Sequence, residues 1–65
     1  MNVGKSIKIL QKRKRITNQM LADHMGVNNS QVVRWRNNED MKASTLVAIA
    51  KYMEVSALEL LQDRL

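Results

Sequence analysis

Residues 17–38 read T-N-Q-M-L-A-D-H-M-G-V-N-N-S-Q-V-V-R-W-R-N-N, two short amphipathic patterns separated by a single glycine. Apolar residues keep helical spacing before Gly26 and resume it afterwards, which predicts one helix on each side. Gly26 supplies the left-handed conformation that ends a helix, and Asn28 is a good N-cap for the next one. Two helices this close in sequence, joined by roughly four residues, form a helix-turn-helix unit.

The same spacing, followed along the rest of the chain, predicts five helices. The fifth has a clear start, because Ser56 and Glu59 have the spacing of a capping box. Trp35 is expected in the core, against Leu10 and Leu21. The helices are expected at about residues 3–14, from Thr17 as N-cap to Met25, from after Asn28 to about Asn37, from about Ala43 through Met53, and from Ser56 onward.

Composition favours one compact all-α domain over residues 1–65. The chain has no cysteine and no proline, and only two glycines, so it lacks disulfides, thiolate ligands and the usual signals of hairpins. No segment resembles a membrane span or a signal peptide, so we expect a cytoplasmic protein with no membrane partner. No catalytic dyad is apparent. We therefore expect a protein that is not an enzyme, with no cofactor, metal or small-molecule ligand.

The charge of the chain is unevenly distributed. Residues 1–36 contain eight of the 11 lysines and arginines but one of the six acidic residues, whereas residues 37–65 are slightly acidic. A positive half of this kind suits a polyanion, and the other half suits an uncharged partner or a second copy of the chain. A charge asymmetry with no partner is the alternative.

Four motifs together resemble a known family. They are T-x-x-x-L-A-x-x-x-G-V at residues 17–27, Val32-x-x-Trp35, L-x-x-I-A at residues 46–50 and V-S-x-x-E-L-L at residues 55–61. In these motifs the chain resembles the helix-turn-helix proteins of the lambdoid phage Cro and repressor type, often called the XRE family. The resemblance covers nearly the whole chain. It implies a five-helix DNA-binding domain, usually dimeric, that regulates transcription.

The resemblance implies that the start of the third helix faces base edges in the major groove. The chemistry of its side chains suits that role, because an amide pairs with adenine, a guanidinium with guanine, and an apolar group with the thymine methyl. The expected base contacts are Asn29, Ser30, Val33 and Arg34. Of these, Asn29 is the first choice as a base reader and Arg34 the second.

Phosphate contacts are expected from helix N-termini and flanking polar groups. The candidates are Thr17, Asn18, Gln19, Asn28, Arg36, Asn37 and Lys42. For Asn28, helix capping is the favoured role. Asn18 departs from the family, which usually has glutamine directly after the threonine, and this leaves the second-helix contact open.

Further departures concern a charged pair and three glycines. The family often pairs a glutamate at position 36 with an arginine at position 11. Here Arg36 and Gln11 replace them, so we expect the buried pair to be absent and Arg36 to be available to DNA. Glycine is usual where Arg15, Asn38 and Glu54 stand, and a left-handed backbone at each would cost about 1 kcal/mol.

The fifth helix carries more leucines than one face of so small a domain can bury. Leu58, Leu61 and Leu65 share one stripe at spacing i, i+3, i+7 and form the predicted dimer interface. In the alternative, Leu58 covers the fourth helix and Leu65 frays at the terminus.

These observations favour a transcriptional regulator of phage or mobile-element type that binds double-stranded DNA. We expect a homodimer on a pseudo-palindromic operator, acting as a repressor by promoter occlusion. The alternative is a helix-turn-helix interaction module (an antitoxin, antirepressor or assembly factor) with weak or no DNA binding. Large apolar residues on the exposed third helix would favour that alternative. Single-strand or RNA binding would require exposed stacking aromatics.

Overall fold

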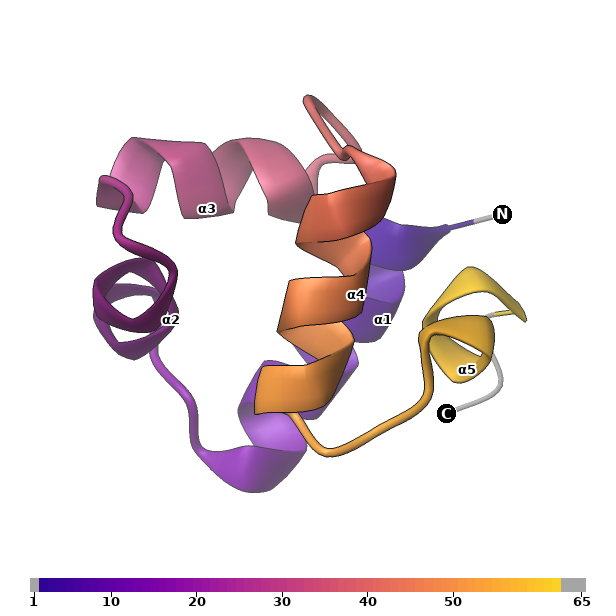
Figure 1. Ribbon diagram of the computed structural model, residues 1–65. Helices are drawn as coiled ribbons and strands as arrows, with labels where there is room; N and C mark the ends of the chain where they lie inside the picture. Colours follow the sequence, from indigo (N-terminus) through magenta and orange to yellow (C-terminus); the bar gives the residue numbers. More distant parts are fainter. Residues whose placement is uncertain (1, 63–65) are drawn as a thin grey trace.

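The computed structural model describes residues 2–62, which form five helices joined by short loops (Figure 1). No strand occurs within this range. The helices are α1 (Val3–Lys14), α2 (Asn18–Met25), α3 (Asn29–Arg36), α4 (Ala43–Tyr52) and α5 (Ala57–Gln62). The predicted all-α fold is confirmed, and the helix ends agree closely with those expected from the sequence.

Local signals set the ends of the two central helices. The Thr17 hydroxyl caps α2 by accepting the Met20 N–H at 3.1 Å, and Gly26 ends α2 in the left-handed region at a φ of 69°. Asn28 precedes α3 as predicted, but its side chain makes no capping hydrogen bond. The side-chain cap expected there is therefore wrong. Asn28 is exposed and serves α3 only through its backbone carbonyl, which accepts the Gln31 N–H at 3.0 Å.

Only one of the two hydrogen bonds of the predicted capping box forms at the start of α5, the one from the Glu59 N–H to Ser56. Ser56 Oγ accepts the Glu59 N–H at 3.1 Å. The Glu59 carboxylate accepts the Ser56 hydroxyl at 3.4 Å, in place of the backbone N–H that a reciprocal box would use.

All five helices contribute to the core. α3 packs against α1 and α2, and α5 packs against α1 and α4. Trp35 is only 4% exposed and belongs to the same buried cluster as Leu10 and Leu21, as predicted. The buried apolar residues are Val3, Ile7, Leu10, Leu21, Ala22, Val32, Trp35, Leu46, Ile49, Ala50, Met53 and Leu60.

Four residues other than glycine have a left-handed backbone. Three of them, Arg15, Asn38 and Glu54, are the positions where the resembling family usually has glycine, with φ of 55°, 62° and 59°. The fourth is Asp40, at 55°, which the sequence did not indicate. Each conformation costs on the order of 1 kcal/mol in a residue with a side chain, less for asparagine.

Close contacts hold α1 against α3 and α5. Gly4 lies so close to α3 that a Cβ at this position would collide with the carbonyl of Arg36. The buried Ser6 hydroxyl donates to the Leu60 carbonyl at 3.2 Å and so joins α1 to α5. At the other side of the molecule, the rings of His24 and Tyr52 stack at 4.0 Å and link α2 to α4. The position of α3 is thus set by backbone contact with α1 as well as by its buried face.

Candidate nucleic-acid interface

One face of α3 is exposed, and it carries the residues that the sequence nominated as base readers. Val32 and Trp35 are buried, which turns the opposite side of the helix outward. Val33 is 45% exposed although it is apolar. All four nominated side chains, Asn29, Ser30, Val33 and Arg34, are exposed.

These four residues share the outward side of the helix because of their spacing. Positions 29, 30, 33 and 34 are related by steps of one, three and four, which at roughly 100° per residue places them within one arc. The exposed Asn37 follows at the C-terminal end of the same arc. The arc carries amide, hydroxyl, guanidinium and one small branched apolar group, so it offers hydrogen bonds together with one methyl-sized contact.

Arg34 has an ion-pair partner that the sequence did not indicate. Its Nη1 donates to Oδ2 of Asp40 at 2.7 Å, and the two side chains are 59% and 52% exposed. Asp40 lies in the loop between α3 and α4 in a left-handed conformation. No local spacing rule predicts this contact, because the pair spans the end of a helix and an irregular loop.

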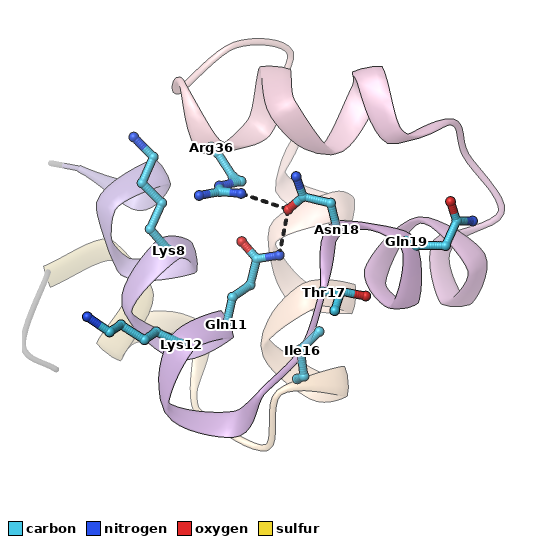
Figure 2. A pocket seen from close by; sticks show the side chains of 8 residues that line it. All are labelled: Lys8, Gln11, Lys12, Ile16, Thr17, Asn18, Gln19 and Arg36. Atoms are coloured by element: carbon cyan, nitrogen blue, oxygen red, sulfur yellow. Dashed lines mark hydrogen bonds between the residues drawn. The ribbon is translucent and has the colours of Figure 1, made fainter.

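At the start of α2, the side chain of Asn18 is the centre of a small hydrogen-bond network (Figure 2). Its Oδ1 accepts N–H groups from Arg36 on α3 at 2.8 Å and from Gln11 on α1 at 2.9 Å. The network therefore joins three helices. The sequence left Arg36 without a partner in the protein, whereas its half-buried guanidinium donates to Asn18. Its contact with a phosphate stays a prediction.

The donor and acceptor directions in this network follow from Arg36. A guanidinium has only donors, so the oxygen of Asn18 must face it, and Gln11 must then turn its nitrogen toward the same oxygen. As a result, Gln11 Oε1 is buried without a hydrogen-bond partner among the described residues. The amide nitrogen of Asn18 keeps its own two N–H groups for other acceptors.

The network forms the floor of an open, cationic cleft between α1, α2 and α3 (Figure 2). No acidic residue is among those that line it in residues 2–62. The lining residues are Lys8, Gln11, Lys12, Ile16, Thr17, Asn18, Gln19 and Arg36. Three cations beside the N-terminus of α2 create a surface that attracts anions.

The other nominated polar residues lie around α3 in the part of the chain that the structure describes. Gln19 is exposed, and its amide donates to Asp23 at 2.6 Å. Asn37 ends α3, and the exposed Lys42 precedes α4 and makes no capping hydrogen bond. Lys42 also lines a cleft with Asp40 and Trp35. The nominated residues thus lie in two clefts beside α3, Asn18 and Arg36 in one and Lys42 in the other.

The leucine stripe of α5 is only partly an exposed surface. Leu58 is 58% exposed. Leu61 is half-buried and packs against the core, where it lines a groove with Val3, Met41 and Leu46. Leu65 lies outside the described residues.

Residues 2–62 contain neither a candidate membrane-spanning helix nor a candidate metal site. No helix there has the length and apolar character needed to cross a bilayer. No three histidine, aspartate or glutamate side chains come together where they could hold a metal ion.

A family model described as "Cro/C1-type HTH DNA-binding domain" (HTH, helix-turn-helix) matches residues 6–63 of the 65-residue chain. This range includes the whole of α2 and α3 and most of α1. Comparison with curated proteins and with solved structures gives no match.

Proposed function

The chain belongs to the Cro/C1-type helix-turn-helix DNA-binding domains, and from this premise we propose that it is a sequence-specific transcriptional regulator that inserts α3 into the major groove. The observation that carries the proposal is the exposed arc of α3, which is polar and cationic around the single apolar Val33. An interaction module would present large apolar side chains at these positions.

In this proposal the side chains of the arc read bases. Asn29 pairs with adenine through its amide, and Arg34 pairs with N7 and O6 of guanine. Val33 contacts a thymine methyl, which gives a reason for an exposed valine among polar neighbours. Ser30 donates to or accepts from an adjacent base edge.

The phosphates on either side of the groove are bound by the groups around α3. On one side, the N-terminus of α2 offers backbone N–H groups from its first turn, together with the side chains of Thr17, Asn18 and Gln19. Lys8 and Lys12 add positive charge to the same cleft. On the other side, Lys42 and Asn37 bind the backbone, and Asn28 adds its amide before α3. Arg36 contributes through Asn18 and through its charge.

We further propose a homodimer that represses transcription by occluding a promoter. Leu58 is a large exposed apolar residue of α5, the helix that comes last in the chain and contributes no residue to the cationic cleft. The predicted interface consists of Leu58, Leu61 and Leu65. A two-fold axis there would place the two α3 helices about 34 Å apart, one turn of DNA, on an inverted repeat.

Selection from randomised duplex DNA tests the function directly. The protein is incubated with a duplex pool, bound DNA is amplified through several rounds, and the enriched sequences are read. An inverted repeat whose half-sites are separated by one helical turn is the expected result. No enrichment, with affinity that depends on salt alone, would contradict sequence-specific binding.

A further inference from the structure

We propose that Asp40 is a specificity-determining residue. It orients the guanidinium of Arg34 toward a base edge, and its negative charge reduces the attraction of Arg34 to the phosphates of random DNA. This inference rests on the proposed function, in which Arg34 contacts a base. An acidic residue repels the phosphates of DNA. Asp40 can nevertheless favour recognition, because its partner is the base-reading Arg34.

The geometry of the pair leaves Arg34 able to read a base while it remains bound. Nη1 of Arg34 donates to Asp40 Oδ2 at 2.7 Å. A guanidinium has five N–H donors in a planar fork, so one bond to a carboxylate leaves the others for the two acceptors of guanine. Both side chains are more than half exposed, at 59% and 52%, so the fork is accessible from outside.

The loop that leads to Asp40 is fastened to α3 and to α1. The Glu39 N–H donates to the Arg34 carbonyl at 2.8 Å, and the Asn38 N–H donates to the Trp35 carbonyl at 3.0 Å. Asn38 Oδ1 in turn accepts the Gly4 N–H at 2.7 Å, which fastens the loop to α1. The backbone up to Glu39 is therefore fastened, which places Asp40 beside Arg34, and in this proposal Asp40 orients Arg34 before DNA arrives.

The charge of Asp40 affects random DNA more than the preferred site. Random binding draws on the release of counterions by cations, and Arg34 paired to Asp40 contributes little to it. At the preferred site, guanine supplies two directed hydrogen bonds that an already oriented guanidinium can make without losing further rotamer freedom. Asp40 thereby widens the difference between the two affinities.

The test compares Asp40→Asn with Glu39→Gln. Both substitutions remove one negative charge from the same loop, but the Glu39 carboxylate makes no ion pair within residues 2–62. Asparagine tolerates the left-handed backbone of position 40, so the variant keeps the fold, which thermal melting verifies. Affinities for the selected duplex and for a random duplex are measured by gel-shift titration at several salt concentrations, and their ratio is the readout.

We expect Asp40→Asn to reduce the ratio of specific to random affinity about threefold, within the range that exposed ion pairs contribute, chiefly by tighter random binding. Glu39→Gln should raise both affinities alike and leave the ratio unchanged. In an Arg34→Ala background, Asp40→Asn should behave like Glu39→Gln, because the partner is gone.

The possible failures can be told apart. If Arg34→Ala lowers the ratio but Asp40→Asn changes it no more than Glu39→Gln does, the role of Asp40 is overturned and Arg34 stands as a base reader. If Arg34→Ala itself leaves the ratio unchanged while a preferred site exists, Arg34 reads no base and both assignments fall.

Discussion

The backbone N–H of Gly4 donates a 2.7 Å hydrogen bond to the side-chain oxygen of Asn38, 34 positions later in the chain. Asn38 also donates through Nδ2 to the side chain of Asn2 at 3.1 Å. This contact joins the first turn of α1 to the loop that follows α3. It requires close approach of the two segments, since even a methyl group on Gly4 would meet the carbonyl of Arg36.

Gly4→Ala should therefore destabilise the protein, by about 1–3 kcal/mol, as overpacked sites usually do. Alanine is a better helix former than glycine, so local propensity alone would change stability in the opposite direction. Urea denaturation followed by circular dichroism measures the free energy of unfolding. Lys5→Ala, exposed on the next position of α1, is the control. A Gly4→Ala protein as stable as the wild type would show that α1 and α3 separate at no cost.

Trp35→Ala should remove about 3–5 kcal/mol, which for a domain of this size approaches its whole stability. The side chain is 4% exposed and lies within the main core cluster. Val33→Ala, on the exposed side of the same helix, should cost little. Thermal melting compares the two variants. A Trp35→Ala protein that melts like the wild type would contradict a core role for this residue.

Base readers and phosphate ligands should differ in their effect on specificity. Asn29→Ala should cost about 1–3 kcal/mol on the preferred site and relax the preference at one base position. Lys42→Ala should weaken binding to all sequences and flatten the dependence of affinity on salt. Titrations on specific and random duplexes measure both effects. If both variants weaken binding to the two duplexes equally, Asn29 reads no base.

Asn18→Asp should stabilise the fold and weaken DNA binding at the same time. A carboxylate would accept the N–H groups of Arg36 and Gln11 more strongly and would favour the N-terminus of α2, for a gain of about 0.5–1 kcal/mol. The same charge would repel a phosphate from the cleft. The control is Asn18→Asp in an Arg36→Met background, where the gain should shrink. Equal gains in both backgrounds would show that Arg36 does not bind this side chain.

Leu58→Glu combined with Leu65→Glu should give a folded monomer that loses cooperative binding but keeps weak half-site contact. The reason is that a charge on each leucine would face its own copy across a two-fold interface. Sedimentation measures the mass of both proteins. A wild type that is monomeric at high concentration, or a double variant that stays dimeric, would rule out this interface.

The helices could be predicted because each depends on residues close in sequence. Thr17 and Gly26 act on their own helix ends, and the apolar spacing around Trp35 determines which side of α3 is buried. The left-handed positions Arg15 and Glu54 could be suspected only through the resemblance to a family with glycine there. Asp40 has no such counterpart, and its conformation was missed.

The side-chain pairing at the candidate interface could not be predicted, because it depends on how helices approach one another. Nothing local connects Asn18 with Arg36, and the sequence left Arg36 without a partner. Likewise, Arg34 reaches Asp40 only because the loop turns back beside α3. The side-chain cap expected from Asn28 does not form. The amide is exposed, so water can satisfy its hydrogen bonds in place of the first turn of α3.

The burial of Trp35 has a practical consequence for optical work on this protein. It is the one tryptophan of the chain, so fluorescence excited at wavelengths that tyrosine does not absorb comes from one side chain, on the buried side of α3 and close to the Asp40 loop. Unfolding should shift that emission to the red as the indole meets water. Docking on DNA through the outward arc of α3 should leave its wavelength unchanged, so a shift on titration with duplex would report movement of the loop rather than contact with a base.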